Sequence, residues 1–443
     1  MFRDELHKFT KNVYQFLIGN EGPTNCGLLV KHTGTQEKDG DFSFPNTIKP
    51  WRELLKCDAK TNTDCTLLQY VNKDVQCLID ESKKWDISLS KAEERGDRVH
   101  LFLDRAPAIL VGLLNSIETH HIIAQCFTIK PSSVQLDPLC DDTQDVTSLR
   151  VKRLAKVVEN LYAISAKCRE WSPQIFVTTK STTNRPGSRV IHCGPVLNAK
   201  SGMKETAVTG SELISMRQTD LQMVFEHKLG GRIPPDSPWS EYMLVVGDSS
   251  VTFDLLRTKP SSPVVIEFAP LISANKGATF ILYNCARLQK MLSYYNMSRA
   301  YPSLPDFEDT DFGLLTHEDE WNLVFNFILG LPHILNNAVH IDDNTCVFRP
   351  HSICIFVSAM VKAFSKYYRN VKILTAPRPH LLPVLFARIY MLKILNDCLK
   401  FCLKLLNMKT LGKVSQYVGI TNTALHERRE KKMFCLETQS SRD

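Results

Sequence analysis

Two amphipathic segments near the C-terminal end constrain the fold of this chain more than any other feature. In each segment, apolar side chains recur every three or four residues and basic side chains fall on the other side, which is the pattern of an α-helix with one buried face. The segments cover residues 352–374 and 386–408, and the Pro-bounded residues 375–383 connect them. They predict a helical hairpin with a positively charged exterior.

The basic side chains of this region are almost unopposed by acidic ones. Residues 344–413 contain twelve Lys and Arg and one acidic residue, Asp397, so their net charge is +11. The whole chain carries +7, which leaves the remainder net acidic. A Lys-rich face that is merely solvated is the alternative interpretation, but solvated faces normally mix both signs. The excess therefore indicates a polyanionic partner, and we expect a nucleic acid.

Candidate RNA-binding residues come from the basic faces of the two helices and from their connector. Since unpaired bases can stack on aromatic rings, Tyr367 is added as the first candidate for stacking and Tyr390 as the second. For Tyr367 the alternative is a core tyrosine with a solvated hydroxyl, and Tyr368 is expected on the face away from the basic side chains. The predicted set is Lys362, Lys366, Tyr367, Arg369, Lys372, Arg378, Tyr390, Lys393, Lys400 and Lys404.

Three sequence motifs of this region match one known family. An Ala363-Phe364 pair followed by Tyr367-Tyr368 lies in the first helix, and Arg, Leu and Lys alternate through residues 388–406. Upstream, residues 283–288 read Tyr-Asn-Cys-Ala-Arg-Leu. Together they resemble the DALR anticodon-binding domain of arginyl-tRNA synthetases, in which the upstream motif reads Tyr-Ala-His-Ala-Arg-Ile. Cys285 stands where the family has His.

The N-terminal part predicts an α/β domain. A helix is expected over residues 5–18, a turn at 40–45, a short helix at 51–56, and a strand at 99–103 that leads into a helix ending near Leu114. This order resembles the N-terminal additional domain of arginyl-tRNA synthetases, which contacts the tRNA elbow. Residues 131–148 are polar and without a pattern, so they are expected to form a linker or a disordered loop.

The middle part predicts a reduced α/β region. A helix is expected at 149–171 and strands at 174–178 and 190–197, and further apolar runs follow at 242–246 and 264–268, separated by Pro- and Gly-rich turns. His192 and its neighbours resemble the strand that precedes the nucleotide-closing loop of the synthetases. A lone His on a strand is more often a core residue than a catalytic one.

Catalytic motifs are missing from the chain. Amino-acid activation by this class of synthetase needs a His-x-Gly-His turn, whose imidazoles stabilise the reacting phosphate, and a Lys loop over the pyrophosphate. The sequence contains no His-x-Gly-His, no Walker loop and no Gly-x-Gly-x-x-Gly, and residues 200–204 are at most a degenerate Lys loop. A reaction chamber is therefore not expected, although both RNA-contacting ends resemble the family.

The resemblance implies a non-catalytic relative of arginyl-tRNA synthetase that recognises arginine tRNAs and presents their anticodon loop to a 3-methylcytidine tRNA methyltransferase. A protein-interaction scaffold without RNA binding and a divergent arginine-tRNA ligase remain as alternatives. The expected parts are an α/β N-terminal domain at 1–125, a linker at 126–148, a reduced α/β region at 149–270, an all-α DALR-like domain at 271–410 and a basic tail at 411–443.

Other classes of protein are not indicated. The N-terminal residues mix acidic and basic side chains without an apolar run behind them, and no window reaches the roughly 18 uncharged apolar residues of a membrane helix, so a soluble cytoplasmic protein is expected. The fourteen Cys lack the paired spacing of metal sites and are expected to be reduced, mostly buried thiols. No metal, no cofactor and no DNA partner is expected.

Overall fold

The structure is a computed structural model, and it describes residues 2–22, 27–56, 65–127, 134–138, 144–165, 174–180, 188–229, 232, 234, 238–268, 277–341 and 345–409. The chain divides into two compact units. The first comprises Met1–Ile122, Pro302–Leu335 and Lys366–Leu395, and the second comprises Ile123–Tyr301, Asn336–Ser365 and Asn396–Asp443. The basic tail predicted for 411–443 and the basic residue Lys413 lie outside the described residues.

The first unit begins with helix α1 (Glu5–Ile18), which has the bounds expected from the sequence. The carboxylate of Asp4 accepts a hydrogen bond from the backbone N–H of His7 at 2.9 Å and so caps the first turn. Gly19 ends the helix in the left-handed conformation, with φ 74°. Leu6, Phe9 and Val13 recur at helical spacing on its buried face.

An antiparallel sheet in the order β1-β2-β4-β3 forms the centre of the N-terminal part. Its strands are β1 (Val30–Lys31), β2 (Phe42–Pro45), β3 (Leu89–Arg95) and β4 (Arg98–Leu103). Short helices lie between them: α2 (Gln36–Asp39), η1 (Lys49–Trp51), α3 (Arg52–Leu55), α4 (Leu67–Tyr70) and α5 (Val75–Ser82). Gly40 has φ 74°, and a Cβ there would lie 2.7 Å from the carbonyl oxygen of Leu101, so this turn requires glycine.

Several helices follow the sheet. Helix α6 (Arg105–Cys126) extends well beyond the end near Leu114 that the sequence suggested. Later in the chain come η3 (Phe312–Leu314), α12 (Glu318–Leu323), a π-helical turn (Val324–Ile328) and α13 (Leu331–Ala338). In the first unit, the indole of Trp321 stacks on Phe325 with ring centroids 5.2 Å apart, and Phe325 contacts Phe42 of the sheet edge-on at 5.7 Å.

The second unit contains parallel strand pairs. Strands β5 (Val134–Leu136), β6 (Gln174–Thr178) and β7 (Ser188–His192) form a three-stranded parallel sheet, and β8 (Val196–Asn198) pairs in parallel with β9 (Val264–Ile266). Helix α8 (Val146–Ala163) starts three residues before the expected helix. The prediction of a linker over 126–148 was wrong for residues 134–136, because their backbone pairs with β6, and for 146–148, which begin α8.

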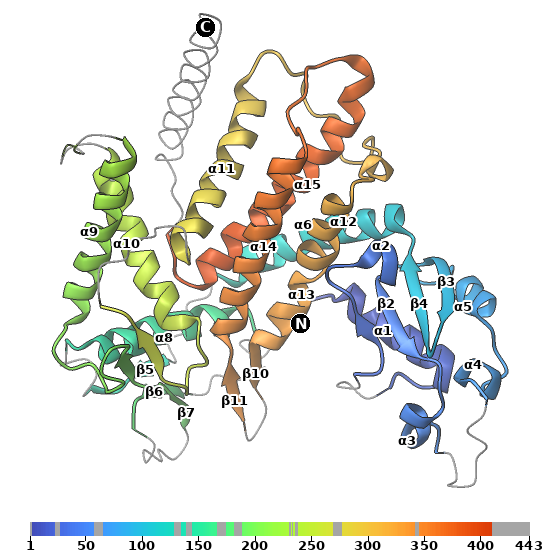
Figure 1. The fold of residues 1–443 in the computed structure, drawn as a ribbon, viewed down its shortest axis with the longest axis horizontal. Coiled ribbons are helices and arrows are strands. Elements are labelled where there is room, and N and C mark those ends of the chain that lie inside the picture. The colour runs from blue at the N-terminus through green and yellow to red at the C-terminus, as the bar shows by residue number, and fades with distance from the viewer. Residues whose placement is uncertain are drawn as a thin grey trace, which may run out of the picture. The chain divides into compact units, whose positions relative to one another are not determined.

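Two helices of the second unit differ from the sequence-based expectation. Helices α9 (Gly210–Leu229) and α10 (Pro238–Leu256) lie side by side (Figure 1), and α10 includes the apolar run 242–246, which the sequence pattern left unassigned. Both pack with α8 and with the β8–β9 pair around one apolar core. The buried residues of this core are Val146, Val196, Leu213, Val251, Leu255, Val264 and Ile266.

A buried arginine fastens the loops of this core. The guanidinium of Arg150 on α8 is almost fully buried and donates hydrogen bonds to four carbonyl oxygens, those of Gly194, Leu255, Lys259 and Ser262, at 2.6 to 3.2 Å. Burial lowers the pKa of Arg150 from its ordinary value. Because its donors meet carbonyl groups rather than an acid, Arg150 holds the backbone in place rather than forming an ion pair.

The C-terminal part is mainly helical, as the sequence predicts, but the domain expected to be all-α also contains one β-hairpin. It consists of α11 (Ala278–Met297), the hairpin of β10 (Val339–Ile341) and β11 (Cys346–Phe348), α14 (Pro350–Asn370), η5 (Pro379–Leu381) and α15 (Leu382–Leu405). Its long helices include α11, α14 and α15 (Figure 1). The two amphipathic segments are thus confirmed as helices α14 and α15, each contributing to both units. Within the described ranges, no helix is long and apolar enough to cross a membrane.

Candidate nucleic-acid interface

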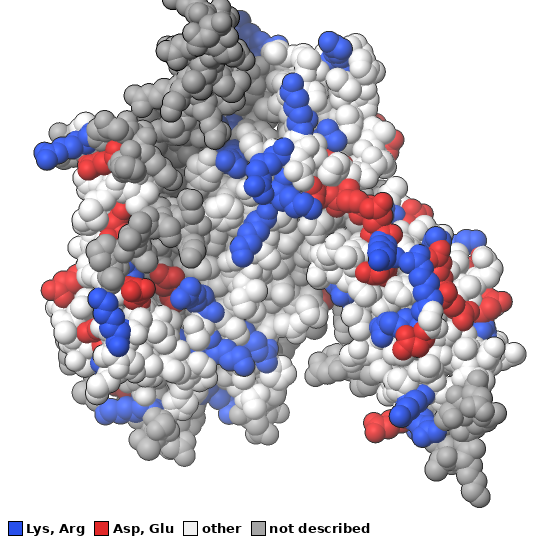
Figure 2. Space-filling model, viewed as in Figure 1, with Lys and Arg blue, Asp and Glu red and all other residues white. Residues whose placement is uncertain are grey.

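The basic face of α14 is present as the sequence predicts. Lys362, Lys366 and Arg369 follow one another at intervals of four and three residues and are exposed. The opposite face is buried through Val357, Met360, Val361, Phe364 and Tyr367. Figure 2 shows Lys and Arg side chains gathered over α14 and α15, with acidic side chains at one edge.

Helix α15 has the same division into a buried and a basic face. Leu392, Leu395, Leu399 and Leu403 are buried, whereas Lys400, Lys404 and Asp397 are exposed and Lys393 is half-buried. In the connector between the helices, Lys372 and Arg378 are exposed. Every predicted basic candidate is therefore at the surface, and Lys362, Lys372, Arg378 and Lys400 make no ion pair with any other described residue.

Two lysines of α15 lie against aromatic rings. The Nζ atom of Lys404 is 3.9 Å from the ring centroid of Phe127, and that of Lys393 is 5.7 Å from the centroid of Tyr390. These cation–π contacts place the ammonium groups themselves against the rings and so restrict where the two charges lie. The end of the same helix is held by Asn160, whose amide donates to the carbonyl oxygens of Lys404 and Leu405, both at 3.1 Å.

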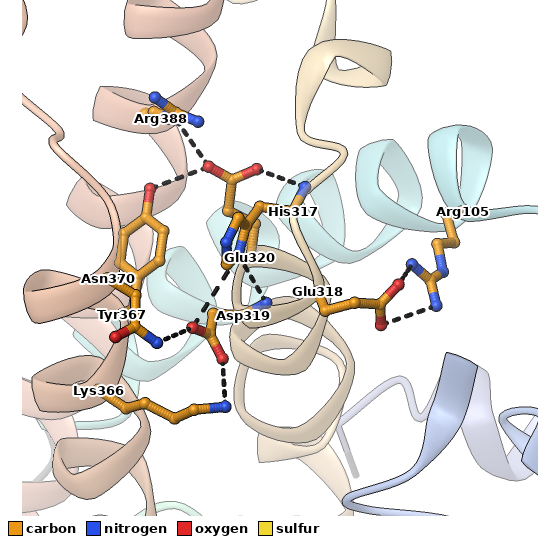
Figure 3. Close-up of polar contacts among 9 residues, drawn as sticks. All are labelled: Arg105, His317, Glu318, Asp319, Glu320, Lys366, Tyr367, Asn370 and Arg388. Atoms are coloured by element: carbon orange, nitrogen blue, oxygen red, sulfur yellow. Dashed lines mark hydrogen bonds and ion pairs between the residues drawn. The ribbon is translucent and has the colours of Figure 1, made fainter. Parts of the chain in front are cut away.

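A short acidic helix, α12, supplies tertiary partners for part of the basic face (Figure 3). The side chain of Asp319 accepts hydrogen bonds from Lys366 at 2.7 Å and from the amide of Asn370 at 2.9 Å. Although burial acts to raise its pKa, these two hydrogen bonds and the charge of Lys366 lower the pKa of Asp319 below its ordinary value. Lys366 is thus engaged inside the protein, while its side chain remains 61% exposed.

The neighbouring carboxylate, Glu320, is fully buried and joins three elements (Figure 3). It accepts hydrogen bonds from Nε of Arg388 on α15 at 2.7 Å, from the hydroxyl of Tyr367 on α14 at 3.1 Å and from the backbone N–H of His317 at 3.1 Å. The side chain of His317 accepts in turn from the backbone N–H of Asp319 at 3.1 Å, which completes a capping box at the start of α12. Glu320 therefore positions both helices that carry the basic faces.

The structure does not support the expected stacking role of Tyr367. Tyr367 is fully buried with its hydroxyl on Glu320, so a base cannot stack on its ring; burial and the charge of Glu320 raise its pKa. Tyr368, expected on the buried side, is 40% exposed. Tyr367 is buried because of a tertiary contact: its partner Glu320 lies 47 residues away in the sequence. The periodicity of α14 alone does not reveal that contact. Tyr390 is half-buried, and its hydroxyl donates to the carbonyl oxygen of Pro305 at 2.5 Å.

The acidic helix is itself held to the N-terminal sheet within the first unit. The buried carboxylate of Asp41 accepts hydrogen bonds from the indole N–H of Trp321 at 2.7 Å and from the backbone N–H of Leu103 at 2.8 Å. Burial raises the pKa of Asp41 despite these bonds. On the outer side of α12, Glu318 forms a half-exposed ion pair with Arg105 of α6. The carboxylates of α12 consequently have fixed positions.

The remaining sequence candidates do not assemble into a catalytic or metal site. His192 lies exposed on β7 rather than in the core, and Lys204 of the degenerate Lys loop pairs with Asp145 at 3.4 Å. Cys285, which stands where the related family has His, is buried, and burial raises the pKa of its thiol to about 12. Among the described residues, no three His, Cys, Asp or Glu side chains are grouped as metal ligands would be.

Comparison with known proteins gives the relationship of this chain. Residues 281–414 match the family model described as DALR anticodon binding domain. The DALR anticodon-binding domain-containing protein 3 of Rattus norvegicus is 30% identical over 229 residues, which cover 50% of this chain and 42% of that protein. An arginine–tRNA ligase of Borreliella burgdorferi is 32% identical over 283 residues, covering 61% of this chain and 45% of the ligase.

A solved structure shares the fold. The arginyl-tRNA synthetase of Thermus thermophilus superposes with a TM-score of 0.52 at 11% identity, covering 93% of this chain and 100% of that one. The resemblance to the DALR proteins and the synthetase-like α/β and helical architecture are thereby confirmed. The chain spans less than half the length of the curated relatives it matches.

Proposed function

We propose, starting from this relationship to DALR-domain proteins, that the chain is a non-catalytic tRNA-binding adaptor. It recognises arginine tRNAs and presents their anticodon loop to a 3-methylcytidine tRNA methyltransferase. The observation that carries the tRNA-binding part is the exposed basic faces of α14 and α15, which lie inside the segment that matches an anticodon binding domain. Lysine and arginine on such faces neutralise phosphates and release counterions.

Internal ion pairs engage two cations of this region, of which only Lys366 is a predicted RNA contact. Arg388 is bound to buried Glu320, and Lys366 is shared with Asp319. The phosphate contacts are therefore assigned first to residues whose charge has no such partner among the described residues. These are Lys362, Lys372, Arg378 and Lys400. Lys393 and Lys404, which lie against aromatic rings, and the exposed Arg369 at the end of α14 form a second group of proposed contacts.

The absence of catalysis is proposed from the sequence. Adenylate formation in this class of synthetase uses a His-x-Gly-His turn to stabilise the transition state, and this chain contains no such motif. The segment between the N-terminal sheet and β7 holds α6, β5, α8 and β6. Residues 104–187 contain only two glycines, Gly112 and Gly187, so the sequence has no glycine-rich turn there.

Specificity for arginine tRNAs is supported by the similarity to arginine–tRNA ligases. The methyltransferase partner is supported by the resemblance to the non-catalytic relatives of the synthetase.

The test is a methylation assay with a purified 3-methylcytidine methyltransferase, in which an arginine tRNA and a leucine tRNA are compared with and without this protein. We expect the protein to increase methylation of the arginine tRNA only. Equal rates with and without the protein would refute the adaptor function, and binding of the enzyme without tRNA would favour a scaffold.

A further inference from the structure

An aromatic cluster at the C-terminal end of α11 is not used by the basic faces described above. Tyr294, in the last turn of α11, is 54% exposed, and Met297, three residues later, is 74% exposed. Large apolar surfaces at such exposure normally mark a binding site when they are contiguous. Both side chains lie on one side of the helix, because residues three apart are neighbours on a helix surface.

The ring of Tyr294 is part of an ordered arrangement. Tyr301 folds back onto the helix and stacks on Tyr295, with ring centroids 5.3 Å apart and planes at 30°. Tyr294 contacts the ring of Tyr301 edge-on, with ring centroids 6.4 Å apart and planes at 72°. Tyr295 is buried and anchors the group, and the turn between the rings is closed by the backbone N–H of Ser298, which donates to the carbonyl oxygen of Tyr294 at 2.9 Å. The exposed ring is therefore preorganised.

The charged residues that neighbour this cluster along the sequence are all basic. Residues 268–305 include four basic residues, Lys276, Arg287, Lys290 and Arg299, and no Asp or Glu. Arg287 is occupied within α11, where it donates to the hydroxyl of Tyr283 at 2.7 Å and lies over its ring. Lys290 lies one helical turn before Tyr294, and Arg299 is exposed in the turn that follows the helix.

We propose that the exposed ring of Tyr294, held in place by its edge-on contact with Tyr301, is a platform on which an unpaired RNA base stacks, with Lys290 and Arg299 contacting the adjacent phosphates. An exposed aromatic ring beside cations is the arrangement by which proteins bind single-stranded nucleic acid. The platform also replaces Tyr367, which is buried, as the group that reads unpaired bases. This assignment rests on the proposed tRNA binding.

The test uses the whole chain and two RNA probes, a hairpin with a seven-nucleotide loop and a blunt duplex of the same stem. Tyr294→Ala should weaken hairpin binding by about 5- to 150-fold, the range for loss of one stacked base, and leave duplex binding unchanged. Tyr294→Phe, which keeps the ring, should bind the hairpin as the wild type does. Tyr70→Ala is the matched control, since Tyr70 is 41% exposed on α4.

The outcomes separate this proposal from the function on which it rests. If the wild type binds neither RNA, tRNA binding itself fails. If the wild type binds the hairpin and Tyr294→Ala binds it equally well, only the platform is refuted. If Tyr294→Ala keeps hairpin affinity but loses affinity for the methyltransferase, the cluster is a protein-docking face and the RNA assignment is overturned.

Discussion

Removal of the Glu320 carboxylate should destabilise the protein more than removal of any neighbouring acid. Glu320 is fully buried, and its partner Arg388 is 17% exposed at the side chain. In Glu320→Ala, the guanidinium and the hydroxyl of Tyr367 both lose their acceptor in a site that water barely reaches. Breaking a buried ion pair from one side costs about 3–5 kcal/mol, and the loss of the Tyr367 hydrogen bond is part of that cost.

Glu318→Ala is the matched control because Glu318 lies two residues away on the same helix and also pairs with an arginine. Its side chain is 41% exposed and that of Arg105 is 29% exposed, so this pair contributes about 0–1 kcal/mol. A double variant, Glu320→Leu with Arg388→Met, removes both charges together and should recover most of the stability, because a buried pair replaced by apolar residues of similar size is nearly neutral.

The assay is urea unfolding followed by circular dichroism. With a slope of about 2 kcal/mol per molar urea, the midpoint of Glu320→Ala should fall by about 1.5–2.5 M, against at most about 0.5 M for Glu318→Ala. Equal midpoints for these two variants would refute the conclusion that Glu320 holds α14 and α15 in position. A double variant as unstable as Glu320→Ala would show that packing, rather than the unpaired charge, determines the loss.

Three further predictions follow from the same structure. Tyr367→Phe should lower the free energy of unfolding by about 1–2 kcal/mol and Tyr368→Phe by less than about 0.5, since only the first hydroxyl is buried on a carboxylate; similar losses in thermal melting would contradict this. The pKa of Asp319 is lowered from 3.8, so its contribution to stability is present above that pH and is lost as the pH falls below it. The stability difference between wild type and Asp319→Asn should therefore shrink between pH 7 and pH 3, and a constant difference in urea unfolding would exclude the ion pair as its origin. The purified protein should catalyse neither arginine-dependent pyrophosphate exchange nor RNA methylation, and either activity would disprove the adaptor function.

Local patterns predicted the elements whose determinants lie within one segment. Helix α1 and strand β6 have the predicted bounds, because a capping Asp, a terminal Gly and a short apolar run are readable locally. Helix α10 was not recognised, since the apolar run 242–246 fits either a strand or a buried helix. Strand β5 was taken for a linker because a three-residue strand is defined by its partner rather than by its own composition.

The site shows the same division between local and tertiary information. The basic faces of α14 and α15 follow from periodicity and are exposed as predicted. The burial of Tyr367 and the neutralisation of Lys366 and Arg388 could not be predicted, because both depend on the carboxylates of α12, which lie outside the segment whose charge was counted. Counting charge within one segment therefore overestimated the number of cations available to RNA. The absence of Asp and Glu around Tyr294 is visible in the sequence, but no known motif there indicated a binding site.

The central claim, that tRNA binds through the basic faces of α14 and α15, is tested most directly by a salt titration of tRNA affinity. Lys362, Lys372 and Lys400 are changed together to Gln, and the control changes Lys156, Lys200 and Lys204 of the second unit to Gln, which removes the same charge. Since each lost phosphate contact flattens the plot of log K against log salt by somewhat less than one unit, the first variant should lose about two to three units of slope and the control none. An unchanged slope in the first variant, or an equal loss in both, would contradict the claim.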